Sequence, residues 1–549
     1  DNLQKFLWQG YEATKDEGIL DLFNLSYPQA KEGKFGYIDV EKPEEKAQLL
    51  QAAKDPNLPI HERSHNLTDY GDALLRQRTR HGCNVHMYYG RTKGHGHLDK
   101  MNFEIIAHGM NFSPDLGYPE YAENVPSRYQ WTSNTVSHNT VMVDQSGQNN
   151  TDYAGIPYGF EDSSSVKFID VDDSDVYDQV SMYRRALCMV DITPEKAYIV
   201  DFFRVAGGER HELSFHGGEG DVTVTGVQLH AQTRGTLEGE DVPYGEWIGG
   251  KGSQRGNGYS FLYDVKKSEE SSDYVELTYE LKDTWGTRKD MKGQPYLKVY
   301  MPGDKCKTVM AKGKPPTNKI GNPKYLYYYL GERQGIDLES RFVSVYEPFV
   351  DQGAILSVVS VEVNGDKNSF ATGCVKITLN DGSVDYIVHS IDTDSLLTIG
   401  DQIIFQGGFG YLKVKDGQVS RAFMSNASLL TYKGKTLLEN KEPCFTGSVV
   451  DYQKQISEEN WIDLTMDQEI SSLDSLMGKF IYIEGNRVGN AAYEILTVEK
   501  SEDDLYRVHV GESAVRGYKE ACDPESGYVY RFTEGARFKI PMSCEFKRF

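Results

Sequence analysis

Closely spaced cysteines are missing from this sequence of 549 residues. Its seven cysteines are scattered without a CxxC pair, which excludes a zinc ribbon and a dense disulfide scaffold. The sequence also lacks an apolar run of about 18 residues, so we expect no membrane span. Basic residues are outnumbered, 59 against 82 acidic ones, and the net charge of −23 argues against a nucleic-acid partner.

Aromatic residues and glycines are abundant, with 36 tyrosines and 53 glycines. This composition favours strands joined by tight turns over helical bundles. From about Ala73 onward, apolar and polar residues alternate with a period of two in many segments, such as "CVKITLNDGSVDYIVHS". The pattern predicts a mainly β fold built as a large antiparallel β-sandwich.

Shifts in this pattern divide the chain into three expected domains. Residues 1–75 are predicted to be helical, because "DNLQKFLWQGYEATKDEGILDLF" carries apolar residues at spacings of three and four. Residues 76–437 are predicted to form the large sandwich. The alternation resets between Leu438 and Cys444, so residues 438–549 are predicted to form a small C-terminal β domain.

Histidines gather in the first part of the chain, and the pair in "GHGHLDK" is the most suggestive. His95 and His97 point to the same face if this segment is extended. Two imidazoles on one face bind zinc, or one binds a metal while the other does chemistry. Asp115 and His138 are the natural candidates for a further ligand. On spacing alone, two hydrogen-bonded surface histidines remain an alternative.

The sequence around His95 and His97 resembles a known family. "GHGHLDKMNFEIIAHGMNFSPDLGYPEY", then "WTSNTVSHNTVMVD" and "YRRALCMVDITPEKAYIVDFFRVAGGERHELSFHG", together resemble the heparinase II/III-like polysaccharide lyases. The resemblance is clear over residues 70–220 and looser to about residue 435. It implies an N-terminal α/α toroid followed by a large antiparallel β-sandwich, a supersandwich, and cleavage of uronate-containing polysaccharides by β-elimination.

The resemblance also implies roles for individual residues. His95 falls on the catalytic histidine of the family, whereas His97, Asp115 and His138 fall on the ligands of one structural zinc ion. From the residues themselves, we expect Asp99 to hydrogen-bond a ligand histidine, with a carboxylate that faces water as the alternative. For substrate binding, we expect Arg91 to meet an anionic sugar and Trp131 to stack on a sugar ring. The alternatives are a surface ion pair for Arg91 and core burial for Trp131.

The sequence departs from the family at its N-terminal side. Only about 75 residues precede the sandwich, so this segment is expected to be the end of a toroid. The catalytic tyrosine and the residue that neutralises the uronate carboxylate are then expected in a missing N-terminal part. Whether the chain acts alone stays open.

Two other functional classes remain in view. A cupin-like metal-dependent oxygenase would use His95, His97 and Glu104, although the gap between the histidines and the glutamate is long. A non-catalytic carbohydrate-binding sandwich would use aromatic residues as sugar platforms and a metal to hold the fold.

The expected partner is an anionic polysaccharide or oligosaccharide, with a homodimer as a further expectation. The size of such a substrate predicts a periplasmic or secreted location. Because the chain is acidic overall, a polyanionic substrate requires basic residues at the mouth of the cleft. The candidates are Arg91, Lys93, Lys100 and Arg128.

Overall fold

The structure is a computed structural model. It describes residues 2–14, 19, 23, 63–79, 81–92, 96–117, 127–164, 166–248, 256–288, 290–316, 321–485, 489–501, 505–520 and 523–548. The chain divides into two compact units, one of Asp1–Arg63 with Arg78–Arg80 and one of Ser64–Gln77 with His81–Phe549.

The first unit contains the helix α1 (Asn2–Thr14). Leu7, Trp8 and Tyr11 are buried, as their spacing of three and four predicts, and the Trp8 ring lies 6.0 Å from that of Phe23. A helix at the start of the chain is therefore confirmed. Its assignment to the end of a toroid stays a prediction.

A five-stranded antiparallel sheet opens the second unit, with the order β1-β2-β3-β4-β5. Its strands are β1 (His65–Leu67), β2 (Asp72–Arg76), β3 (Asn84–Tyr88), β4 (Asn102–Ala107) and β5 (Met110–Asn111). The predicted helical segment is thus wrong beyond residue 64. The β2 sequence "DALLR" alternates partly exposed and buried residues, so it forms a strand that packs by one face.

A 13-stranded sheet forms the centre of this unit, with β6-β11-β17-β16-β18-β10-β9-β8-β7 as its main path. These strands are β6 (Val141–Val143), β7 (Ile156–Asp162), β8 (Val166–Asp172), β9 (Met182–Thr193), β10 (Lys196–Ala206), β11 (Arg210–His216), β16 (Pro295–Gly313), β17 (Leu326–Gln334) and β18 (Glu339–Val350). The branches are β12 (Gly220–Thr225), β13 (His230–Ala231), β14 (Leu262–Lys267) and β15 (Ser272–Leu281).

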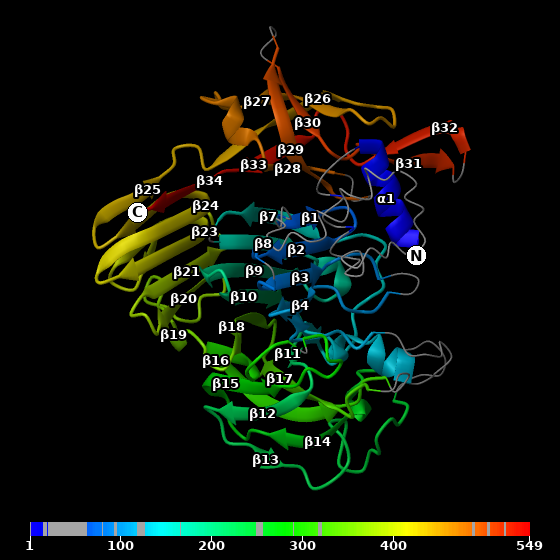
Figure 1. The fold of residues 1–549 in the computed structure, drawn as a ribbon, viewed down its shortest axis with the longest axis vertical. Helices are drawn as coiled ribbons and strands as arrows, with labels where there is room; N and C mark the ends of the chain where they lie inside the picture. The colour runs from blue at the N-terminus through cyan, green and yellow to red at the C-terminus, as the bar shows by residue number, and fades with distance from the viewer. Residues whose placement is uncertain are drawn as a thin grey trace. The chain divides into compact units, whose positions relative to one another are not determined.

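An eight-stranded sheet follows, with the main order β19-β20-β21-β23-β24-β25. Its strands are β19 (Ile355–Ser360), β20 (Thr372–Leu379), β21 (Val384–Ser390), β22 (Leu397–Ile399), β23 (Ile403–Lys415), β24 (Gln418–Tyr432), β25 (Lys435–Glu439) and the C-terminal β34 (Ser543–Lys547). In Figure 1 this yellow sheet lies on one side of strands β7–β10 and the blue five-stranded sheet on the other.

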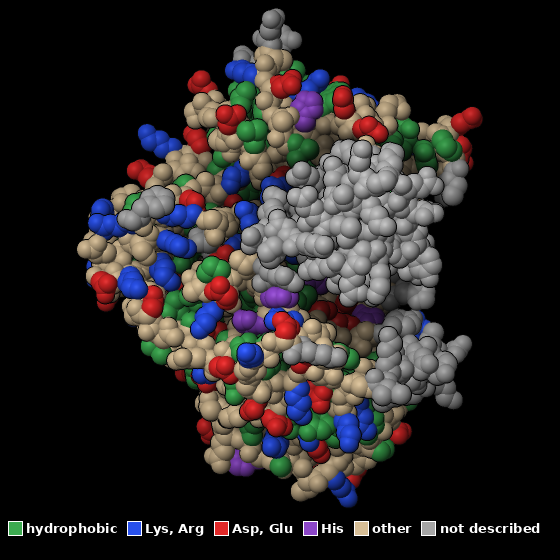
Figure 2. Space-filling model, viewed as in Figure 1, with side chains coloured by type: hydrophobic (Ala, Val, Ile, Leu, Met, Phe, Trp, Pro, Cys, Tyr) green, Lys and Arg blue, Asp and Glu red, His purple; other side chains and the backbone are tan. Residues whose placement is uncertain are grey.

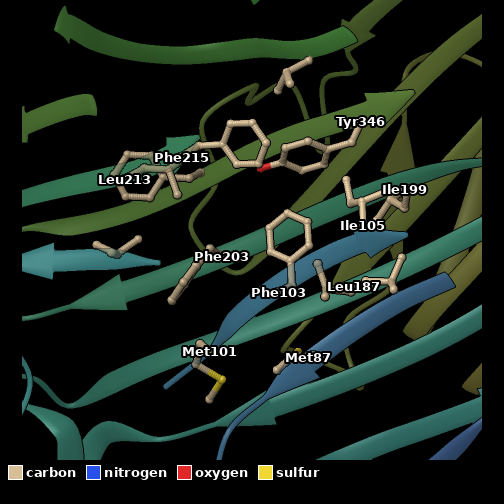
Figure 3. Packing of buried hydrophobic residues seen from close by; sticks show 14 of the residues in the cluster. Met87, Met101, Phe103, Ile105, Leu187, Ile199, Phe203, Leu213, Phe215 and Tyr346 are labelled. Carbon is tan, nitrogen blue, oxygen red and sulfur yellow. The ribbon is translucent and has the colours of Figure 1, made fainter. Parts of the chain in front are cut away.

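Two apolar layers hold these three sheets together. Leu187 and Ile199 of the central sheet point into a cluster with Phe103 and Ile105 of the five-stranded sheet (Figure 3). Their neighbours Cys188 and Val200 point the other way, into a cluster that includes residues of β20 and β23. Strands buried on both faces explain the continuous apolar runs of β9 and β10. The mainly β architecture of stacked antiparallel sheets is confirmed.

The last part of the chain forms a closed barrel, β26-β27-β30-β29-β28-β33, with its own apolar core. Its strands are β26 (Cys444–Tyr452), β27 (Asn460–Met466), β28 (Phe480–Ile483), β29 (Ala491–Lys500), β30 (Tyr506–Val510) and β33 (Arg537–Pro541). A separate pair is formed by β31 (Val515–Glu520) and β32 (Asp523–Tyr530). The predicted domain boundaries at residues 75 and 437 stay predictions.

The described residues contain no helix long and apolar enough to cross a membrane. Short helical turns occupy η2 (Arg128–Thr132), η3 (Thr135–Ser137), η4 (Ser174–Val176), η5 (Tyr259–Phe261) and η6 (Leu473–Leu476).

Packing between the central and eight-stranded sheets can be tested at Phe409. Its ring stacks on Phe168 with centroids 4.3 Å apart, so Phe409→Ala leaves a cavity between the sheets. We expect the free energy of unfolding in urea to fall by about 3–5 kcal/mol. Leu396→Ala is the control, because Leu396 is 59% exposed, and equal losses in both variants would contradict this packing.

Candidate metal centre

Four side chains converge at one end of the five-stranded sheet: His97, Asp99, Asp115 and His138. One ligand atom from each lies within 4.8 Å of all the others. His97 and Asp99 precede β4, Asp115 follows β5, and His138 directly follows η3. Segments far apart in the sequence therefore meet at a single point, as the resemblance implied for His97, Asp115 and His138.

The His138 ring is fixed by the turn that precedes it. Its Nδ1 donates to the backbone oxygen of Asn134 at 2.8 Å, and the Asn134 side chain caps η3 by accepting from the Thr135 amide. With Nδ1 protonated, neutral Nε2 carries a lone pair. This atom lies 3.1 Å from His97 Nδ1 and 3.0 Å from Asp115 Oδ2.

The Asp115 carboxylate is placed by a turn of its own. The Gly117 amide donates to Oδ1 at 2.6 Å, which leaves Oδ2 directed at His138. Burial alone would raise the pKa of Asp115, but His138 and His97 beside it hold that pKa below its ordinary value. The Asp115 carboxylate is therefore ionised at neutral pH.

The Asp99 carboxylate is buried beside this group. No hydrogen-bond donor among the described residues reaches its Oδ1. Burial raises the pKa of Asp99 to about 6, against the lowering influence of His138. Asp99 therefore offers an oxygen to the same point as the other three side chains. The expected hydrogen bond from Asp99 to a ligand histidine stays a prediction.

Two imidazole nitrogens and two carboxylate oxygens form a donor set that fits a divalent cation. Zinc takes four such ligands in a tetrahedral arrangement. Without a cation, the buried Asp99 Oδ1 has no hydrogen-bond donor among the described residues, which is costly. The geometry fits the predicted zinc, although metal binding itself stays a prediction.

A residue that the sequence did not single out anchors the loops of this site. Arg185 of β9 is fully buried and donates from Nε and Nη2 to both oxygens of Asp201, at 3.0 and 2.6 Å. Its Nη1 donates to the backbone oxygens of Met101 and Asn139. These positions follow Asp99 and His138 closely, so one guanidinium fixes both segments to the central sheet.

Asn139 and Thr140 reinforce the same junction. Asn139 donates to the backbone oxygen of Phe103 at 3.1 Å and accepts from the His216 amide at 2.9 Å. Thr140 donates to the backbone oxygen of Lys100 at 2.9 Å. The segment after His138 is therefore bonded to the strand that follows Asp99.

Other predicted site residues have different outcomes. His95 lies outside the described residues, as does Lys93, and Arg91 is exposed. Trp131 is 1% exposed, stacks on Phe261, and donates from its indole nitrogen to the Lys314 backbone oxygen at 2.7 Å. This burial contradicts a sugar-stacking role for Trp131 and supports the alternative of a core residue.

The prediction that basic residues lie at the mouth of the cleft is wrong for Lys100. Lys100 is buried and its ammonium contacts Asp173 Oδ2 and the Tyr153 backbone oxygen, both at 2.6 Å. It therefore cannot meet a substrate. On the face seen in Figure 2, acidic and basic side chains are interspersed over the described surface.

Glu104, the third ligand of the oxygenase alternative, is not among the four clustered side chains. Its carboxylate instead accepts from the Asn111 side chain at 2.5 Å. The geometry therefore does not favour the cupin arrangement.

Residues 85–250 match the family model described as Heparinase II/III-like, C-terminal. The resemblance to this family is thereby confirmed over these residues. No curated protein sequence matches the chain.

Similar solved structures include the heparan sulfate lyase HepC from Pedobacter heparinus, at 13% identity and a TM-score of 0.38, over 67% of this chain and 47% of that one. A heparinase III matches at 15% identity and a TM-score of 0.38, over 60% of this chain and 42% of the other. A galactose mutarotase-like protein from Lactobacillus casei matches at 7% identity and a TM-score of 0.26, over 51% of this chain and all 100% of its own. The chain spans less than half the length of the two lyases.

The anchoring role of Arg185 predicts a strong effect of Arg185→Lys. A lysine cannot bond both oxygens of Asp201 and two backbone oxygens, so buried acceptors lose their donors. We expect the free energy of unfolding in urea to fall by about 3–5 kcal/mol.

The matched control is Arg507→Lys, because Arg507 also bonds both oxygens of an aspartate, Asp463, but is 41% exposed. This change should cost about 1 kcal/mol or less. Similar losses of unfolding free energy in the two variants would contradict the anchoring role of Arg185.

Proposed function

We propose that this chain is part of a polysaccharide lyase that cleaves a uronate-containing polymer by β-elimination. The observation that carries the proposal is the match of residues 85–250 to the heparinase II/III-like C-terminal domain. The convergence of His97, Asp115 and His138 supports it, because the implied catalytic histidine, His95, lies two residues before His97.

In the proposed reaction, neutralisation of the uronate carboxylate makes the C5 proton acidic. A base removes that proton, the C4–C5 double bond forms, and the C4–O bond breaks. An acid delivers a proton to the leaving glycosidic oxygen. A histidine suits either proton step, because its acid and base forms are both accessible near neutral pH, and we assign one of them to His95.

For the metal, we propose one structural zinc ion per chain, held by His97, Asp99, Asp115 and His138. Four protein ligands complete a tetrahedral site and leave no position for substrate. The ion would tie the loop before β4, the turn after β5 and the end of η3 to one another. Its contribution is therefore to keep the segment next to His95 in place.

The substrate class proposed is an acidic polysaccharide. Arg91, four residues before His95 in the sequence, is the candidate contact for a sugar carboxylate. Because a polysaccharide is a large substrate, we propose a periplasmic or secreted location for the enzyme. A homodimer stays a prediction.

Lyase activity is tested by the ultraviolet absorbance of unsaturated uronate when the chain is mixed with uronate polymers. We expect His95→Ala to lower the rate by at least about 100-fold. His86→Ala is the control, because His86 bonds Asp72 at 2.9 Å and lies outside the cluster. If the polymer slows migration of the chain in affinity electrophoresis but the ultraviolet absorbance does not rise, the carbohydrate-binding alternative is favoured instead.

Zinc binding is tested by elemental analysis of the purified chain. We expect about one zinc per chain, lost in His138→Ala and at least tenfold weaker in Asp99→Asn, because removing a ligand leaves an incomplete site. His86→Ala should retain the metal. Full zinc content in both ligand variants would refute the site.

A further inference from the structure

A cavity is lined by residues of the central sheet, the eight-stranded sheet and the barrel. Figure 1 shows that these three elements lie next to one another near β7. Its volume is about 730 Å³, which is within the range of small-molecule sites. None of the four clustered side chains of the metal centre lines it. Cavities where separately packed units meet are common places for ligands.

Packing and hydrogen-bond contacts between the three sheets surround this cavity, so its walls are part of the fold. Phe160 of β7 packs edge-on against Phe480 of β28 with centroids 5.3 Å apart. Glu161 of β7 accepts from Ser425 of β24 at 2.6 Å and from Lys479 next to β28 at 3.1 Å. Three sheets are thereby fixed around one space.

The floor of the cavity holds an oriented charged group. Arg184 donates from Nε and Nη2 to the two oxygens of Asp170, at 2.9 and 2.7 Å, and His389 Nε2 lies 3.0 Å from the same carboxylate. These contacts leave the remaining nitrogen of Arg184, Nη1, available for a ligand. The guanidinium also lies 4.1 Å from the centre of the Tyr158 ring, which is 47% exposed.

The cavity also holds groups whose bonding is incomplete. The Tyr482 hydroxyl is buried without a hydrogen-bond partner in the described part of the chain. Lys539 is exposed on β33, and no carboxylate among the described residues pairs with it. Arg184 and Arg537 also line the cavity, but they are paired with Asp170 and Asp467. Lys539 therefore brings a positive charge without a carboxylate partner among the described residues, in a chain of net charge −23.

We infer that this cavity binds an acidic sugar of an oligosaccharide, apart from the metal centre. A pyranose has an apolar C–H face that suits the Tyr158 ring and a rim of hydroxyls that suits Tyr482. Its carboxylate pairs with Lys539 and Arg184. The choice of an acidic sugar rests on the proposed function, whereas the cavity itself does not. Such a site would hold the polymer while another part of it is cut.

The test is calorimetric titration of the full chain with an unsulfated tetrasaccharide of alternating glucuronate and N-acetylglucosamine. Lys539→Gln and Tyr482→Phe should each weaken one binding event by about five- to tenfold. Lys435→Gln is the matched control, because Lys435 is also exposed on a strand but lies outside the cavity. Hydrogen exchange should show protection of residues 156–162 and 537–541 by the tetrasaccharide.

Unchanged affinity in both cavity variants, with no protection of those strands, would overturn the inference. The same tetrasaccharide with its carboxyl groups reduced should bind at least fivefold more weakly, and equal binding would overturn the acidic sugar as ligand. The two proposals can fail separately. If the chain binds the tetrasaccharide in the cavity but produces no ultraviolet absorbance, only the lyase proposal fails. If the chain cleaves the polymer and the cavity variants bind the tetrasaccharide as tightly as the unchanged chain, only this inference fails.

Discussion

The buried guanidinium of Arg185 is the interaction on which the candidate centre depends. It bonds Asp201 within the central sheet and the backbone oxygens of Met101 and Asn139 outside it. Phe103 and Phe203 place ring faces 4.4 and 4.8 Å from the same charge. Because breaking the bonds of a buried charge is strongly destabilising, Arg185 holds the loops that carry Asp99 and His138 against the central sheet. The precision of the centre therefore comes from the sheet beneath it.

Much of this arrangement could be predicted from local sequence. Alternation of apolar residues gave the antiparallel sheets, and the spacing of the two histidines with Asp115 and His138 matched the motif of a known family. Other features depend on contacts between distant segments. The burial of Lys100 depends on Asp173, and the burial of Trp131 depends on Phe261 and Tyr328. The strand beginning at His65 was missed because its three residues are too short to show a period.

The acidic net charge takes on a different meaning once side chains are placed. A net charge of −23 spread evenly over the surface would repel a uronate polymer. Because salt screens distant charges, the charges next to a binding surface decide whether the polymer is attracted there. Lys100 is neutralised inside the fold by Asp173, whereas Lys539 lines a cavity far along the chain from the histidine motif. The barrel, with its own core, thus contributes one wall of that cavity. The position of Lys100 next to the histidine motif therefore did not indicate that its charge is buried.

We propose that four side chains from three separate segments bind one zinc ion. X-ray absorption of the zinc-loaded chain would show this coordination. We expect a first shell of about four nitrogen and oxygen ligands at about 2.0–2.2 Å, with outer scattering from two imidazole rings. A shell containing sulfur at about 2.3 Å, or one of oxygen alone without imidazole scattering, would contradict it.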